Sequence, residues 1–118
     1  MTEGSISKTK LSDTILLLRP SSMLDNYAAP EMIEHLSSAL AEGVLFVIVD
    51  LEQVEFISSA GAGSLVGNVE SFRTRGGDLI ICNATDTVLH VFQILDLSDY
   101  LTIHHDLSQA KAAIQSAE

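Results

Sequence analysis

The sequence predicts an α/β domain in which a four- to five-stranded, mostly parallel sheet has about four helices packed against it. Three observations lead to this fold class. First, short apolar runs typical of strands alternate along the chain with stretches of helical periodicity. Second, the runs at 44–49 and 79–82 are apolar on both faces, as in parallel strands covered by helices on each side. Third, the links between elements are short, which favours a simple layered topology.

The sequence of the first half of the chain predicts two strands, a helix and then a buried strand. Thr14 to Leu18 is an apolar run that pairs with Ser5 to Thr9 across a polar turn. A helix follows and ends at Gly43. Its apolar face consists of Met32, Ile33, Leu36 and Leu40. The six apolar residues of the run 44–49 then predict a central strand.

The second half continues the alternation. A helix is expected from about Ala60 to Thr74, where two glycines follow, and the next buried strand runs from Leu79 to Cys82. Asp86 is the expected N-cap of another helix. The apolar residues of that helix are Val88, Leu89, Val91, Phe92 and Leu95. A short strand from Tyr100 to Ile103 and a last helix with Leu107, Ala110, Lys111 and Ile114 complete one domain over residues 1–118.

Composition excludes several classes of protein. With 16 acidic and 6 basic residues among 118, the net charge of −10 argues against binding to nucleic acid. Cys82 is the only cysteine, so a disulfide framework is impossible and a reducing, cytoplasmic location is expected. No apolar run approaches the ~18 residues of a membrane span, so no membrane insertion is expected. Because no Lys or Arg lies between Arg19 and Arg73, that segment should present an acidic face suited to a basic partner.

The most informative segment runs from Asp50 to Leu65, where a buried strand leads through a polar loop to two serines and a helix start rich in small residues. A helix N-terminus offers unpaired backbone N–H groups that favour a phosphate. Two interpretations are open: Ser58 and Ser59 only cap the helix, or one of them is a phosphate acceptor. A dinucleotide-binding loop is disfavoured, because Gly61 and Gly63 lack the third glycine at the required spacing and no basic residue lies nearby.

The segment resembles the STAS domain, named for sulphate transporters and anti-sigma factor antagonists, and especially its bacterial single-domain members. Their signature is a strand, Asp-Leu, a few polar residues, then Phe-Ile-Asp-Ser-Ser/Thr-Gly-Leu-Gly and a helix. The matching residues are Asp50, Leu51, Phe56, Ile57, Ser59, Gly61 and Gly63. The resemblance extends over nearly the whole chain, through Leu24 and Asp25 after the second strand and through Gly76 and Gly77 before the strand at 79–82.

The resemblance implies an anti-sigma factor antagonist that acts as a phosphorylation-controlled partner switch. Ser59 is then the residue phosphorylated by an anti-sigma factor that is a serine kinase, and a PP2C-type serine phosphatase removes the phosphate. The unphosphorylated form binds the kinase and frees the kinase's target, and the phosphorylated form dissociates from the kinase. Partner contacts are expected at Asp25, Ser58, Gly61, Ala62 and Gly63.

Three positions depart from the family pattern. Ser58 replaces the family's Asp, which makes it the alternative phosphate acceptor. Ala60 replaces the second Ser or Thr, which leaves Ser59 the clearer candidate. Ala62 replaces the Leu between the glycines and predicts a smaller contact patch.

The domain is expected to be a substrate of its partners and not an enzyme, with no cofactor and no metal site. His104 and His105 would point to opposite faces of a strand, and Cys82 has no evident activating base. Two other functions stay open: a STAS scaffold or adaptor without a phosphoswitch, serving a signalling complex or a membrane transport system, and a sensor of a small ligand or nucleotide near Gly61. The many apolar residues between Val88 and Leu95 favour core packing, with a second contact surface as the alternative.

Overall fold

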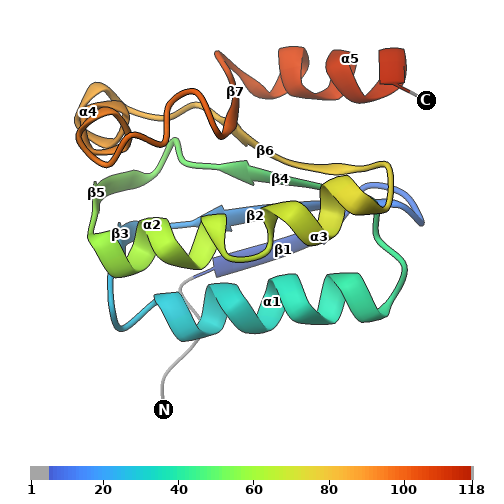
Figure 1. Cartoon of the computed structure of the whole chain (residues 1–118), viewed down its shortest axis with the longest axis horizontal. Coiled ribbons are helices and arrows are strands. Elements are labelled where there is room, and N and C mark those ends of the chain that lie inside the picture. The colour runs from blue at the N-terminus through green and yellow to red at the C-terminus, as the bar shows by residue number, and fades with distance from the viewer. Residues whose placement is uncertain (1–5, 118) are drawn as a thin grey trace.

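Five strands form the main sheet in the order β1-β2-β4-β6-β7, within a computed structural model that describes residues 6–117 (Figure 1). β1 is antiparallel to β2, and the other three pairings are parallel. The strands are Ile6–Lys10 (β1), Ile15–Pro20 (β2), Phe46–Asp50 (β4), Asp78–Cys82 (β6) and Thr102–His104 (β7). The predicted fold class is confirmed.

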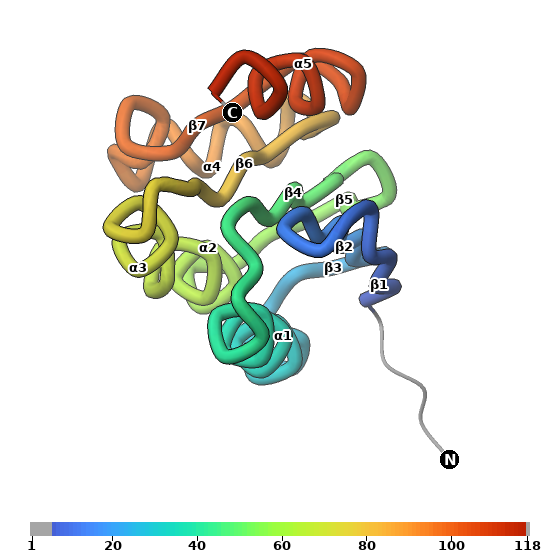
Figure 2. Tube along the Cα trace, turned by 90° about the vertical axis from the view of Figure 1, so that its right-hand side faces the viewer, coloured from blue at the N-terminus to red at the C-terminus, as the bar shows by residue number. Residues whose placement is uncertain are grey.

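β4 occupies the centre of the sheet, and all five of its residues are buried. This burial explains why its sequence is apolar on both faces, since helices cover the sheet on each side. Four helices pack into the larger core: α1 (Ala29–Ala41), α2 (Ser59–Val66), α3 (Val69–Thr74) and α4 (Asp86–Ile94). The last helix, α5 (Leu107–Ala117), covers the opposite face (Figure 2). Ala110 and Ile114 of this helix pack there with Ile48 and Ile80.

A second, two-stranded parallel sheet was not predicted from the sequence. Ser22–Leu24 (β3) pairs with Val54–Ile57 (β5), and Leu24 lies opposite Ile57. These strands are three and four residues long, too short to give a clear periodic signal. β3 ends shortly before α1 begins, and β5 ends shortly before α2 begins (Figure 1).

Three predicted boundaries were wrong. The helix expected from Ala60 to Thr74 is interrupted at Gly67 and Asn68, which separate α2 from α3. Thr85, not Asp86, is the N-cap of α4, and its side chain accepts a hydrogen bond from the backbone N–H of Val88. The strand expected at 100–103 lies at 102–104. Of the expected first strand, Ser5 lies outside the described residues.

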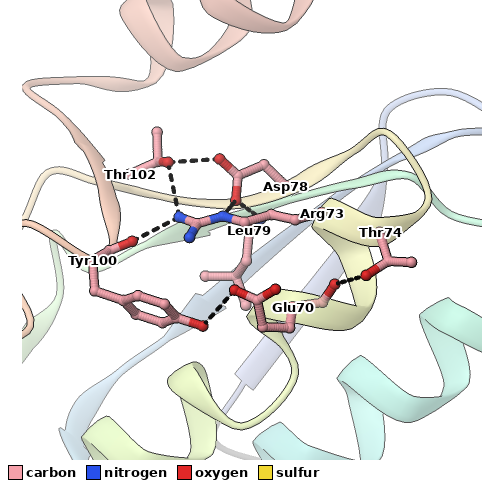
Figure 3. Close-up of polar contacts among 7 residues, drawn as sticks. All are labelled: Glu70, Arg73, Thr74, Asp78, Leu79, Tyr100 and Thr102. Atoms are coloured by element: carbon pink, nitrogen blue, oxygen red, sulfur yellow. Dashed lines mark hydrogen bonds and ion pairs between the residues drawn. The ribbon is translucent and has the colours of Figure 1, made fainter.

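A polar network fastens α3 to β6 and to the segment that enters β7 (Figure 3). Arg73 Nε donates to Asp78 Oδ1 at 3.0 Å, and its Nη2 donates to the carbonyl oxygen of Tyr100 at 2.7 Å. The guanidinium also lies 5.0 Å from the centre of the Tyr100 ring, a cation–π distance. Thr102 donates to the second oxygen of Asp78 at 2.6 Å, and the Tyr100 hydroxyl donates to Glu70 at 3.1 Å. One arginine on α3 thus joins this helix to β6 and to the segment before β7.

Replacing Arg73 by alanine should therefore lower the free energy of unfolding by about 1.5–3 kcal/mol, the range for hydrogen bonds that involve charged groups. Urea denaturation of Arg73→Ala beside wild type measures the change. Lys111→Ala removes an exposed cation from α5 and serves as the control, with little expected effect. Equal losses in the two variants would show that the network does not stabilise the fold.

Candidate functional site

The candidate site forms at the end of the molecule where β3 and β5 finish and where α1 and α2 begin (Figure 1). The backbone N–H of Ser58 donates to the carbonyl oxygen of Leu24 at 3.0 Å, which extends the β3–β5 pairing by one step. This bond brings the chain after β3, which contains Asp25, beside the serines after β5. Two segments more than 30 residues apart in sequence therefore share one surface.

The two serines have different structural roles. Ser58 is the N-cap of α2, with extended backbone angles, and its Oγ accepts the backbone N–H of Gly61 at 3.1 Å. Ser59 is the first residue of the helix and its side chain is exposed. The hydroxyl of Ser58 is therefore engaged in the cap, whereas that of Ser59 faces outward beside the positive end of the helix dipole.

Glycine is required at position 61 because the helix passes directly over β3. A Cβ atom there would lie 1.9 Å from the carbonyl oxygen of Leu24 and 2.7 Å from its carbonyl carbon. Gly63 differs, since a Cβ at that position would meet nothing within 4 Å. Close helix–sheet packing thus explains Gly61 and not Gly63. The space that a side chain of Gly61 would occupy is filled by the backbone of Leu24.

Ala62 is buried within the main core, with only 1 % of its surface exposed. The prediction that its small side chain reduces a partner-contact patch is therefore wrong, because the side chain faces inward. Gly61 is also buried. Of the residues expected to touch a partner, Ser58, Gly63 and Asp25 retain surface, and Ser59 lies among them.

Asp25 organises the entry to α1. Its Oδ1 accepts the backbone N–H groups of Tyr27 at 3.0 Å and Ala28 at 3.1 Å, and its carbonyl oxygen accepts the N–H of Ala29 at 2.8 Å. These bonds satisfy donors that the start of a helix otherwise leaves unpaired. Asp25 therefore has a structural role in addition to the partner contact expected from the sequence.

Behind the site, a buried carboxylate fixes the strand that leads into the motif. Asp50 is 2 % exposed; its Oδ2 accepts Arg19 Nε at 3.0 Å, and its Oδ1 accepts the N–H of Glu52 at 3.0 Å and Asn83 Nδ2 at 3.2 Å. A buried charge needs such partners. Burial, followed by the negative charge of Asp50, raises the pKa of the Cys82 thiol from 9.0 to about 12. This thiol is therefore protonated and inert at neutral pH, as expected for a structural cysteine.

Ser59 lines neither of two hollows formed by described residues. A cavity of about 380 Å³ opens between the β6–α4 and β7–α5 connections, and no Lys or Arg lines it. A smaller one of about 190 Å³ lies beside Arg19, whose guanidinium already pairs with Asp50. In the described part of the chain, no three His, Cys, Asp or Glu side chains gather to hold a metal ion. No helix within residues 6–117 has the length and apolar character needed to cross a membrane.

Comparisons with known proteins identify the family of the chain. The STAS domain model matches residues 7–110, so the chain belongs to the STAS domain family. Within that family, the anti-sigma-B factor antagonist of Listeria monocytogenes is 31% identical over 80 residues, which cover 68% of this chain and 70% of the relative. The class of protein is thus the STAS domain, and the particular likeness is to its anti-sigma factor antagonists.

Solved structures show the same fold. The anti-sigma factor antagonist SpoIIAA in its unphosphorylated form superposes with a TM-score of 0.82 at 21% identity, covering 94% of this chain and 96% of that one. The Bacillus cell fate determinant SpoIIAA in the phosphorylated form gives a TM-score of 0.73 at 22% identity, over 92% and 98% of the two chains. The fold is therefore common to both forms of that protein.

The sequence did not reveal the residues that border the serines. Met23 and Phe56 are opposite one another in the β3–β5 pair, and both side chains are exposed, as is that of Tyr27. Phe56 was read only as part of the family pattern, and Met23 and Tyr27 were not singled out. An apolar residue such as Phe56 in a segment expected to be a polar loop could have indicated a contact surface. Without knowledge of the β3–β5 pair, however, its position on the surface could not be predicted.

The contrast between the two glycines is testable. Gly61→Ala should lower the free energy of unfolding by about 1–3 kcal/mol, because the new methyl group collides with backbone atoms that cannot move independently. Gly63→Ala, in the same helix, should be neutral or raise stability by up to about 1 kcal/mol, since alanine favours a helix and has open space there. Urea denaturation compares them. Equal stability of the two variants would contradict the close packing of α2 on β3.

The raised pKa of Cys82 predicts a dependence of stability on pH. Below pH 9 the thiol is protonated in both the folded and unfolded states and contributes nothing. Between pH 9 and about 12 the unfolded state loses the proton that the folded state keeps, so the free energy of unfolding falls with rising pH. Unfolding of wild type and Cys82→Ala across this range isolates the effect, with wild type expected to fall more steeply. Parallel profiles would contradict it.

Proposed function

We propose that the chain is a phosphorylation-controlled antagonist of an anti-sigma factor, with Ser59 as the phosphate acceptor. The observation that carries the proposal is the contrast between the two serines: Ser58 Oγ is engaged in the α2 cap, and Ser59 is exposed at the first position of the same helix. Membership of the STAS family and likeness to an anti-sigma-B factor antagonist support it.

The partners in this proposal are an anti-sigma factor that is a serine kinase and a PP2C-type serine phosphatase. The unphosphorylated chain binds the kinase and releases the kinase's target. The phosphorylated chain dissociates, and the phosphatase restores it. The chain supplies the substrate hydroxyl and no catalytic group, needs no cofactor or metal, and works in the cytoplasm, where its single cysteine stays reduced.

Electrostatics gives the switch a local mechanism. A phosphate on Ser59 would add a charge of about −1.5 to −2 at a helix N-terminus, where the dipole favours it by roughly 0.3–1 kcal/mol. Against a docked partner the same charge would be desolvated beside an already acidic surface, to which Asp25, Glu52 and Glu55 belong. A loss of about 1.4 kcal/mol lowers affinity tenfold, and desolvation of an unpaired phosphate exceeds that amount. No change of fold is needed.

The test uses the anti-sigma factor kinase of the organism that encodes this chain, purified and supplied with ATP. Mass spectrometry should find the phosphate on Ser59, and Ser59→Ala should abolish phosphorylation. Ser59→Asp should bind the kinase at least about tenfold more weakly than wild type, in line with the energy argument above.

Ser58→Ala is the matched control. It should lose about 1 kcal/mol of stability through the missing cap but remain a substrate. Phosphorylation that persists in Ser59→Ala and disappears in Ser58→Ala would assign the site to the neighbouring serine. Equal kinase binding by wild type, Ser59→Ala and Ser59→Asp would instead favour a scaffold without a phosphoswitch.

A further inference from the structure

The exposed large apolar side chains of the described residues are unevenly distributed. There are six: Leu11, Met23, Tyr27, Ile33, Phe56 and Ile94. Three of them, Met23, Tyr27 and Phe56, lie at the end of the molecule that carries Ser59, on β3, on β5 and in the turn before α1. The other three are aliphatic and scattered over the β1–β2 turn, α1 and α4.

The fold brings Met23 and Phe56 side by side, and Tyr27 lies four residues after Met23 in the chain. Met23 is the register partner of Phe56, and their side chains are 50% and 46% exposed. Tyr27 follows one turn later, is 85% exposed, and is held through its backbone N–H by Asp25 Oδ1 at 3.0 Å. Aromatic residues and methionine are the types enriched at protein interfaces, and a group of them on the surface marks an interaction site more than single exposed aliphatic residues do.

We propose that Met23, Tyr27 and Phe56 form an anchoring surface for the anti-sigma factor partner, immediately beside the serine that controls the complex. This inference rests on the proposed function. The anchoring surface is fixed to the phosphorylation site by backbone, since the carbonyl of Leu24, next to Met23, accepts the N–H of Ser58 at 3.0 Å. A partner seated on the anchoring surface therefore meets Ser59 in a constant position.

Charge specifies the kind of partner surface. Asp25 lies between Met23 and Tyr27 in the chain, Glu55 is the exposed neighbour of Phe56 on β5, and no Lys or Arg occurs between Arg19 and Arg73. Arg19 is already paired with Asp50 at 3.0 Å. The complementary face of the anti-sigma factor is therefore apolar at its centre and basic around it, an arrangement that excludes other acidic proteins and speeds association.

The two parts of the interface then have separate tasks. The anchoring surface supplies most of the affinity, as a small number of aromatic residues does at many interfaces. Ser59 supplies the control, because its phosphate adds an unpaired charge at the margin of the same contact. Removing an anchor residue should weaken the complex without changing which serine is phosphorylated.

The experiment measures the dissociation constant of each variant with the purified anti-sigma factor of the same organism by calorimetric titration. Phe56→Ser and Tyr27→Ser should each raise it about tenfold or more, and Met23→Ser by less. Tyr27→Phe should bind nearly as wild type, because the ring remains. The matched controls are Ile33→Ser, 46% exposed like Phe56, and Ile94→Ser, 66% exposed; both should stay within about twofold of wild type.

Thermal unfolding of each variant separates loss of binding from loss of fold, and Tyr27 is the safest position because it is the most exposed. Wild-type affinity in Phe56→Ser and Tyr27→Ser, or equal weakening in the Ile33 and Ile94 variants, would overturn the inference while leaving the phosphoswitch intact. A wild-type dimer that Phe56→Ser dissociates would assign the anchoring surface to a second copy of the chain and also overturn it. Failure of wild type to bind any anti-sigma factor of its organism would overturn the proposed function itself.

Discussion

The carbonyl oxygen of Leu24 is the contact on which the geometry of the site depends. It accepts the N–H of Ser58 at 3.0 Å, and the same carbonyl lies against the backbone of Gly61, where a side chain would come within 1.9 Å of it. A single backbone group thus sets the start of α2, its distance from β3 and the direction in which Ser59 faces. Since β3 leads directly to Asp25 and α1, this contact also places the two helix N-termini at one end of the molecule.

That arrangement brings the partial positive charge of two helix N-termini close to negatively charged carboxylates. Two helix N-termini provide partial positive charge through unpaired backbone N–H groups, and Asp25 and Ser58 satisfy some of those groups at the starts of α1 and α2. The carboxylates around the site, by contrast, have no exposed basic neighbours in the segment between Arg19 and Arg73. A phosphate on Ser59, as proposed, would therefore be tolerated by α2 and opposed by the acidic surface around it. The balance can change when a partner excludes water, because charges interact more strongly in a less polar environment.

Most of the architecture could be predicted from the sequence because buried helices and strands have apolar residues at a regular spacing. β4 and β6 are covered on both faces and are apolar throughout, and α1 shows its core face in Met32 and Leu36. β3 and β5 have no such regular spacing of apolar residues. Both strands are short, and buried and exposed residues do not alternate strictly along β5, since Glu55 and Phe56 are both exposed. The break between α2 and α3 was missed because the apolar spacing continues through Val69 and Phe72 on the far side of it.

At the site, the sequence predicted which types of residue are present, but it could not predict which side chains face the surface and which face the interior. The sequence indicated a helix start with two serines, but only packing decides that Ser58 caps the helix while Ser59 faces outward. The same limit explains the error at Ala62, whose neighbours Gly61 and Gly63 suggested a common surface. Successive residues of an α-helix are rotated by about 100° around its axis, so adjacent small residues face different environments. Gly61 meets β3, Ala62 enters the core and Gly63 is exposed.

The separation of anchor and switch follows from the same packing. A helix start built from small residues can approach a partner closely but contributes little apolar area, and Ala62 withdraws its methyl group into the core. Burial of apolar area provides about 25 cal/mol per Å², so the serine segment alone offers little affinity for a partner to lose. In the proposed interface, the larger side chains beside it, on β3, on β5 and before α1, supply that area without occupying the position proposed for the phosphate. An interface of this kind can be strong in one state and still be reversed by one charge, because affinity and control reside in different side chains on one rigid frame.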